Sequence, residues 1–192
     1  MDNKQNNQNG TMLNIWILEA KQGGTSFTNI YRYFFPKIFN FVFYRVGHKE
    51  KTEDLVAEIF MKVAKNFKTF SGNDNTLTAW IYTIARNQIY NFYREKNRKT
   101  QLVFAPDEAM EHIAIDTSAQ DQLEYHFDIQ CIRHAMNTLS EDEQEVLSLQ
   151  FFEGLDRHQI ASIIGIKSGA VATRVSRALQ KLKQAIAKEA IQ

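Results

Sequence analysis

The sequence predicts an all-α fold of two small helical domains, joined by a flexible acidic linker, with the second domain ending in a helix-turn-helix. Apolar residues recur at spacings of three and four along most of the chain, which is the period of an α-helix. Only two prolines interrupt its 192 residues. The expected parts are a disordered tail at 1–10, a first domain at 11–99, the linker at 100–120 and a second domain at 121–192.

Charge separates these parts of the chain. Residues 1–100 hold 15 Lys/Arg and 8 Asp/Glu, a net charge of +7, whereas residues 101–128 hold 7 Asp/Glu and no Lys/Arg. Residues 129–192 hold 8 Lys/Arg and 7 Asp/Glu, a net charge of +1. The basic first part indicates a polyanionic partner such as nucleic acid, with a merely solvated basic surface as the alternative. The acidic linker would repel DNA phosphates.

Residue usage also bears on location. The single Cys131 excludes an internal disulfide and suits a reducing cytoplasm. No apolar run approaches the roughly 20 residues of a membrane helix, so we expect no membrane insertion. The polar N-terminus lacks the apolar stretch of a signal peptide. We therefore expect a cytoplasmic protein.

The first domain should contain three main helices. The first is expected from about Phe27 to Gly47, where glycine suits a left-handed cap, and Pro36 should kink it or lie near a break. A second helix is expected to start near Thr52, an N-cap candidate that two carboxylates follow. Its apolar side chains recur at helical spacing up to Phe67.

The third helix is predicted from about Leu77 to Lys99, after a turn-rich loop at 70–76. One face of this helix is apolar. The other face carries polar and basic side chains with tyrosines between them, namely Arg86, Asn87, Asn91, Arg94, Lys96 and Arg98 with Tyr82, Tyr90 and Tyr93. Aromatic rings can stack on bases while cations hold phosphates, as in single-stranded DNA binding. A core stripe with a solubilising basic surface explains the pattern equally well.

The second domain should begin with an amphipathic helix that ends near Leu139. Ser140 and Glu143 have the spacing of a capping box, and the helix that they start should continue to Gly154. Both features rest on local sequence alone.

A helix-turn-helix is predicted after Gly154. Asp156 is placed to cap a short helix over Arg157–Ile164, Gly165 allows a tight turn, and Ser168 should cap the last helix. In such motifs the second helix enters the major groove, where arginine can bind guanine or clamp a phosphate. An ordinary helical hairpin with a charged outer face is the alternative.

No group of residues predicts catalysis or metal binding. Asp54 and Glu58 lie one helical turn apart, but no His, Ser or Cys is near enough in sequence to complete a site. His126, Cys131 and His134 fit no closed zinc signature and lack a fourth ligand. The chain has no Walker loop, dinucleotide-binding turn or nucleophile elbow. We expect no enzyme activity, no metal and no cofactor.

Three segments together resemble the extracytoplasmic-function type of bacterial RNA polymerase sigma factor. They are EDLVAEIF at 53–60, WIYTIARNQIYNFYREK at 80–96 and GLDRHQIASIIGIKSGAVATRVSRALQKL at 154–182. The resemblance implies a non-catalytic subunit that binds core RNA polymerase, directs it to promoters and helps to melt the −10 element. It also implies contacts with the clamp helices of the largest subunit and with the flap, and control by an anti-sigma factor.

The resemblance assigns these contacts to particular residues. Polymerase docking would use Asp54, Leu55, Glu58 and Phe60. The −10 element would be bound by Asn73, Asp74, Arg86, Asn87, Asn91 and Arg94. The −35 element would be read by Ser168, Thr173, Arg174, Ser176 and Arg177. The acidic linker would thread through the RNA exit path of the polymerase.

Four positions depart from the usual pattern of this family. Ala57 stands where glutamine is common, and Asn91 where aspartate is common. Ala170 and Ala172 replace a frequent threonine and a basic residue, which leaves the −35 sequence open. The alternative function is a stand-alone helix-turn-helix regulator that dimerises on half-sites about one DNA turn apart. A helical enzyme acting on nucleic acid has no supporting constellation.

Overall fold

The structure, a computed structural model, describes residues 2–21, 27–95, 132 and 134–189, which form helices and turns without a strand. The all-α prediction is confirmed. An N-terminal body contains α1 (Asp2–Lys21), α2 (Phe27–Val46), α3 (Lys49–Phe67) and α4 (Asp74–Glu95). A C-terminal body contains α6 (Glu141–Leu147), the π-helix η2 (Ser148–Phe152), α7 (Arg157–Ile164) and α8 (Ser168–Glu189). The predicted linker at 100–120 lies outside the described residues.

Helix α2 forms the centre of the N-terminal body. Its buried side chains recur at helical spacing and include Ile30, Phe34, Ile38, Phe41 and Val42. The apolar faces of α1, α3 and α4 pack against it. The helix continues through Pro36, which is exposed, so the chain does not break at this residue. The packing of the neighbouring helices stabilises α2 despite the lost backbone donor.

The turn between α2 and α3 begins as predicted, but α3 starts about one helical turn earlier than predicted. Gly47 has a φ of 64°, which confirms the left-handed cap. His48 is extended, so α3 starts at Lys49 and the predicted start near Thr52 is wrong. Thr52 is fully buried inside α3, and its backbone N–H donates to the carbonyl of His48 over 3.0 Å.

Helix α1 covers the segment for which a disordered tail was predicted at 1–10. Leu13 and Ile17 are buried, and the ring of Trp16 lies 6.2 Å from that of Tyr33 on α2. These contacts hold the second half of α1 against the body. The polar first half continues the same helix and contains no proline to end it.

The C-terminal body confirms the predicted helix-turn-helix. Asp156 accepts hydrogen bonds from the backbone N–H groups of His158 and Gln159, over 2.7 and 2.9 Å. Gly165 has a φ of 75° at the end of α7. Helix α8 includes Ser168 as its first residue, so the predicted capping position is shifted by one residue.

The segment before the helix-turn-helix is only partly as predicted. The capping box is present, because the carboxylate of Glu143 accepts from the backbone N–H of Ser140 over 3.0 Å. The expected helix to Gly154 changes instead into the π-helix η2 after Leu147. Phe151 and Phe152 at the end of η2 are exposed. Single π-helical turns are frequent at functional sites.

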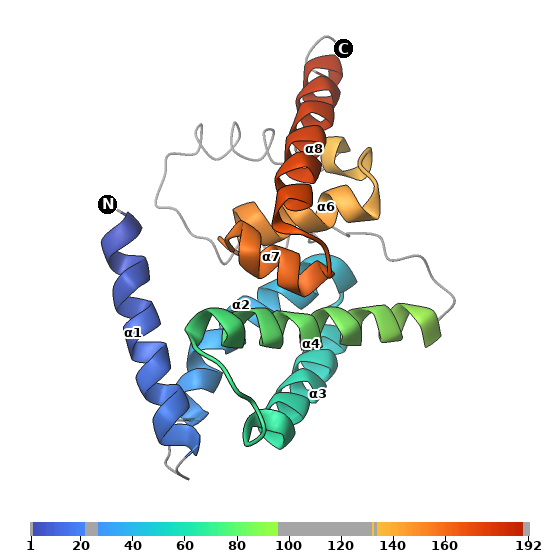
Figure 1. The fold of residues 1–192 in the computed structure, drawn as a ribbon. Helices are drawn as coiled ribbons and strands as arrows, with labels where there is room; N and C mark the ends of the chain where they lie inside the picture. The colour runs from blue at the N-terminus through green and yellow to red at the C-terminus, as the bar shows by residue number, and fades with distance from the viewer. Residues whose placement is uncertain (1, 22–26, 96–131, 133, 190–192) are drawn as a thin grey trace, which may run out of the picture.

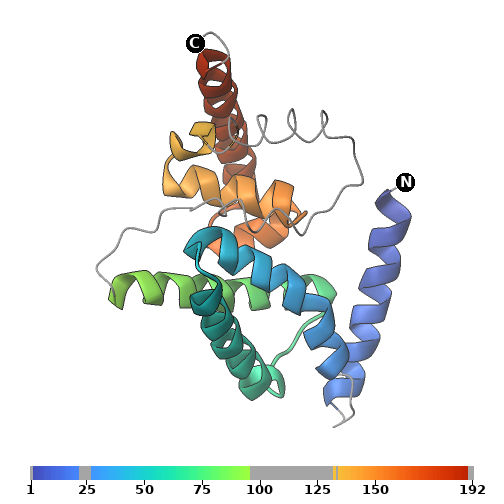
Figure 2. The same cartoon turned by 180° about the vertical axis from the view of Figure 1, so that it is seen from behind.

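The two bodies pack on each other. Helix α7 lies across α4, while α3 packs on another side of α4 (Figure 1). The view from behind shows α8 extending away from the N-terminal body (Figure 2). The helices in the described part of the chain are too short or too polar to cross a membrane.

Candidate nucleic-acid interface

Helix α4 begins at the residues predicted to bind the −10 element. The side chain of Asn73 accepts from the backbone N–H of Thr76 over 3.1 Å, while the backbone N–H of Asn73 donates to the hydroxyl of Thr76 over 2.7 Å. Asn73 therefore caps α4. The backbone N–H of Asp74 donates to the side chain of Asn14 on α1 over 2.9 Å, which fixes the start of α4 against α1.

The polar face of α4 is only partly open. Asn87 and Arg94 are exposed, whereas Asn91 and Arg86 are half-buried. The structure thus gathers these four predicted −10 residues along one helix, but it leaves them with different access to a ligand.

The core alternative holds for two of the three tyrosines that were considered for base stacking on α4. Tyr82 and Tyr93 are 1% and 8% exposed, so they belong to the core. The hydroxyl of Tyr82 donates to the carboxylate of Glu153, and that of Tyr93 donates to the carbonyl of Arg45. Tyr90 alone of the three is half-buried.

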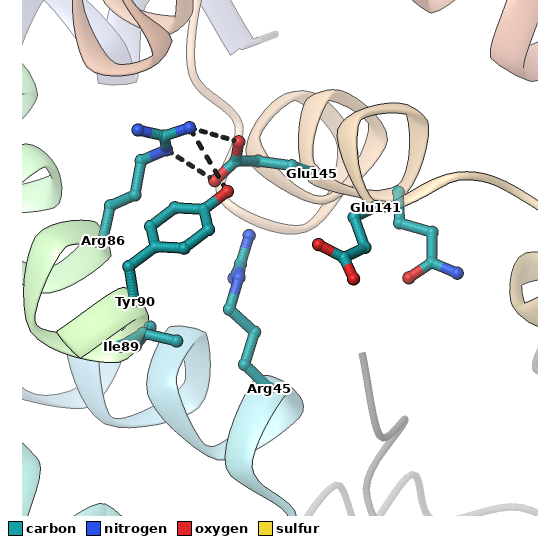
Figure 3. Close-up of a pocket in the computed structure, with 7 residues that line it drawn as sticks. Arg45, Arg86, Ile89, Tyr90, Glu141 and Glu145 are labelled. Atoms are coloured by element: carbon teal, nitrogen blue, oxygen red, sulfur yellow. Dashed lines mark hydrogen bonds and ion pairs between the residues drawn. The ribbon is translucent and has the colours of Figure 1, made fainter. Parts of the chain in front are cut away.

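Arg86 forms a two-pronged ion pair with the C-terminal body. Its Nε and Nη2 atoms donate to the two carboxylate oxygens of Glu145 on α6, over 2.9 and 3.1 Å (Figure 3). Its guanidinium also lies 4.6 Å from the ring centre of Tyr90. Burial lowers the pKa of Arg86, but the bonds to Glu145 outweigh it and raise this pKa overall. The cation is therefore fully charged and held by a carboxylate.

Arg45 lies next to this pair and was missed in the sequence. Its side chain rises from the end of α2 toward Tyr90 and α6 (Figure 3). It is 4% exposed, stacks 3.8 Å from the ring centre of Phe41, and donates from Nη1 to the carbonyl of Phe41 over 3.2 Å. Its Nη2 atom has no hydrogen-bond partner among the described residues. Burial lowers the pKa of Arg45 against the opposing effect of Glu145 and Glu153.

A small cavity between the bodies joins these groups. Its volume is about 20 Å³, which is enough for one water molecule. Its walls are Arg45, Arg86, Ile89, Tyr90, Glu141, Gln144 and Glu145. The side-chain oxygen of Gln144, like Nη2 of Arg45, is buried without a partner in the described part of the chain. Both atoms belong to residues that line this cavity.

Helix α8 presents most of the residues predicted to read the −35 element. Thr173, Ser176 and Arg177 are exposed, and Ser168 is half-buried. The guanidinium of Arg174 lies 3.0 Å from the carboxylate of Asp142 on α6. The opposite face of α8 packs into the core, so the outer face is left for a ligand.

The predicted polymerase-docking residues divide into two kinds. Asp54 and Glu58 are exposed on α3, whereas Leu55 and Phe60 are each 5% exposed and lie in the core. The ring of Phe60 lies 4.7 Å from that of Tyr31, which is exposed on α2. The two buried side chains can shape the surface, but they present little of it directly.

An aromatic row on the outer side of α2 was also missed. It consists of Tyr31, Phe35, Phe39 and Phe43. Successive ring centres are 5.3, 6.0 and 6.1 Å apart. The spacing of four residues was the available signal, since such side chains meet on one face of a helix.

The described residues contain no group of three His, Cys, Asp or Glu side chains that could hold a metal ion. Of the three residues considered for zinc, His134 is exposed. His126 and Cys131 lie outside the described residues.

Sequence comparisons match both bodies. Residues 30–99 match the family Sigma-70 region 2, and residues 129–182 match Sigma-70 region 4. The RNA polymerase sigma factor SigZ of Bacillus subtilis is 31% identical over 144 residues, which are 75% of this chain and 77% of the relative. The ECF RNA polymerase sigma factor BldN of Streptomyces coelicolor is 26% identical over 91% of this chain and 66% of the relative.

A solved structure is also similar. It is the sigma factor RpoE of Bartonella quintana in complex with the anti-sigma factor NepR. The likeness has a TM-score of 0.63 at 26% sequence identity, and covers 83% of this chain and 96% of that one.

Proposed function

The chain belongs to the sigma-70 family of RNA polymerase sigma factors, in its extracytoplasmic-function type, and on this premise we propose that it reads promoter DNA with α4 and α8. The observation that carries the proposal is the match to regions 2 and 4, each of which contains a helix with a polar outer face. The same match favours a sigma factor over a stand-alone regulator.

Helix α4 and the loop before it would bind the melted −10 element. Asn87 and Arg94 offer exposed polar groups, and the half-buried Asn91 and Tyr90 lie along the same helix. Asn73 and Asp74 would place the loop at the base that leaves the stack, while Arg86 would hold a phosphate. Unstacking a base costs a few kcal/mol, which contacts in a pocket must offset.

Helix α8 would read the −35 element in the major groove. Thr173, Ser176 and Arg177 are exposed for base contacts, while Arg174 and Ser168 lie closer to the body and suit phosphates. Ala170 and Ala172 are exposed too, so their small side chains reduce the number of polar contacts at the start of the helix.

The two elements are too far apart for the packed arrangement of the bodies. Their names place them about 25 base pairs apart, or roughly 85 Å of B-form DNA. Helix α4 has 22 residues, so it is about 33 Å long. Since α7 packs directly on α4, the bodies must separate before α4 and α8 can occupy both elements at once.

Core RNA polymerase would bind the exposed side of α2 and α3. Asp54 and Glu58 present carboxylates there, and the aromatic row of α2 presents apolar surface. Leu55 and Phe60 would support this surface from below. Contact of the C-terminal body with the polymerase flap completes the proposed docking.

Three further features follow from the family. The protein would act without catalysis of its own, because the polymerase makes the phosphodiester bonds. It would work in the cytoplasm, where core polymerase and promoters are found. An anti-sigma factor is a proposed partner, supported by the complex of RpoE with NepR.

Run-off transcription on genomic DNA fragments tests the proposal. Purified core RNA polymerase is assayed with and without the chain, and its co-elution with the chain is measured in parallel. We expect discrete start sites that require the chain. Absence of added starts together with absence of co-elution would contradict the proposed function.

A further inference from the structure

We propose that Arg45, together with Arg86, forms a binding site for a backbone phosphate of single-stranded DNA, and that Glu145 occupies this site while the two bodies are packed together. The inference rests on the proposed function in one respect, because it identifies the phosphate as part of promoter DNA. It adds Arg45, which lies outside the residues assigned to either promoter element.

Arg45 is positioned before any ligand arrives. The ring of Phe41 supports one face of its guanidinium, and the carbonyl of Phe41 holds Nη1. The hydroxyl of Tyr93 binds the backbone carbonyl of Arg45 and fixes the end of α2. Nη2 is left for another partner at the cavity, and it has none among the described residues. A buried donor without a partner costs free energy, which an anion bound to Nη2 would recover once the bodies have separated.

Arg86 completes the site from α4. Its guanidinium stacks near the ring of Tyr90, whose hydroxyl accepts a hydrogen bond from Nη2 of Arg86 over 3.3 Å. The two arginines lie close enough for the charge of Arg86 to lower the pKa of Arg45. Two neighbouring cations with supported guanidinium planes suit a phosphate, which accepts several charge-assisted hydrogen bonds.

Glu145 is the anion that occupies this site while the two bodies are packed together. Its carboxylate binds Arg86 through both oxygens and also raises the pKa of Arg45 through its charge. The carboxylate is buried and belongs to α6 of the C-terminal body. When the bodies separate, the carboxylate leaves with α6, and the N-terminal body keeps two cations without an anion. A phosphate then replaces the carboxylate.

The test measures binding of a fluorescein-labelled oligothymidylate to the full chain by anisotropy, across a range of salt concentrations and without polymerase. Glu145→Gln should bind the probe about tenfold more tightly than the unaltered chain, because the carboxylate no longer competes. Adding Arg45→Met should remove this gain. It should also lower the slope of log affinity against log salt by about 0.7, the contribution of one phosphate contact.

Two matched variants separate charge from structure. Glu141→Gln changes the net charge equally on the same helix and removes no ion pair to Arg86, so its gain should be less than half as large. Arg45→Lys in the Glu145→Gln background keeps the charge and should keep the salt slope. Arg45→Met keeps the length and packing of the side chain, and circular dichroism checks its fold.

Hydrogen exchange gives a readout that needs no change at Arg45. In the Glu145→Gln chain, oligothymidylate should protect the end of α2, at 41–46, from exchange. The inference is overturned if Glu145→Gln binds no better than the unaltered chain, if Arg45→Met leaves affinity and slope unchanged, or if protection at 41–46 is missing. These results do not depend on transcription, so failure of the run-off assay contradicts the proposed function separately.

Discussion

Helices α4 and α8 carry the residues proposed to contact DNA, but only α8 presents them freely. Thr173, Ser176 and Arg177 are exposed on α8. On α4, in contrast, Arg86 is bound by Glu145, and Tyr82 is buried with its hydroxyl on Glu153. The difference arises because the C-terminal body turns the outer face of α8 to solvent while it covers part of α4.

The comparison indicates an order of events for the free chain. Duplex DNA can approach α8 without any change in the packing of the bodies. A melted strand can reach Arg86 only after the ion pair to Glu145 breaks. We infer that separation of the bodies precedes binding of the −10 element, and that polymerase or promoter contacts supply the free energy for it.

A core substitution in α7 should have the largest effect on the difference in DNA binding between α4 and α8. Ile160 is fully buried in α7, so Ile160→Ala should cost about 2–5 kcal/mol of stability. Unfolding of the C-terminal body would abolish duplex binding through α8. It would also uncover α4, so binding of oligothymidylate should be kept or strengthened. Chemical denaturation and oligothymidylate binding measure the two effects. Ile160→Val, which costs about 0.5–1.5 kcal/mol, is the matched control. Equal loss of both kinds of binding would show that the bodies do not act separately.

Removing an exposed cation from α8 should have the next largest effect. Arg177→Ala should reduce promoter-specific run-off transcription. The loss of one good base contact should weaken binding of the −35 element by about 1–3 kcal/mol. Binding to core polymerase should stay unchanged. Glu58→Lys, on the opposite body, should weaken polymerase binding and leave duplex binding intact. The proposed division between the bodies fails if both variants lose the same function equally.

Removing the cap of α7 should have a smaller effect. Asp156 accepts two backbone hydrogen bonds at the start of this helix, so Asp156→Ala should cost about 1 kcal/mol of stability. Asp156→Asn keeps a capping acceptor and should lose much less. Thermal unfolding measures both, and an Ala variant as stable as the Asn variant would contradict the role of this cap.

The smallest expected effect is a dependence of the packing on pH. Burial raises the pKa of Glu153, against the opposing effects of Tyr82 and the cations Arg45 and Lys37. Packing of the bodies therefore takes up a proton. This contribution is complete below the usual glutamate pKa of about 4.3 and is lost as the pH rises through the raised value. The radius of gyration should therefore increase as the pH rises through this range, and Glu153→Gln should remove the dependence. An unaltered dependence in that variant would assign it to another group.

Local features of the C-terminal body could be predicted from the sequence. The cap at Asp156 and the turn at Gly165 depend on residues within one helical turn, and both are confirmed. The start of α3 was wrong because the extended conformation of His48 lets the helix begin before Thr52. Nothing in the local pattern distinguishes these two starts.

Contacts between the bodies could not be predicted, since they join residues far apart in the chain. The two faces of α4 read as one apolar and one polar stripe. The polar stripe is itself partly buried by the C-terminal body, which places Tyr82 in the core. Arg45 gave no signal, because its role depends on Phe41 below it and Glu145 opposite it.

A measurement of the distance between the two bodies is the most direct test of their separation on promoter DNA. Lys65 on α3 and Lys183 on α8 are both exposed. Lys65→Cys and Lys183→Cys, combined with Cys131→Ser, can therefore carry a fluorescent donor and acceptor. Energy transfer should be lower in a promoter complex with core polymerase than in the free chain, because the two elements are roughly 85 Å apart. A transcribing complex with the same transfer as the free chain would contradict the separation of the bodies.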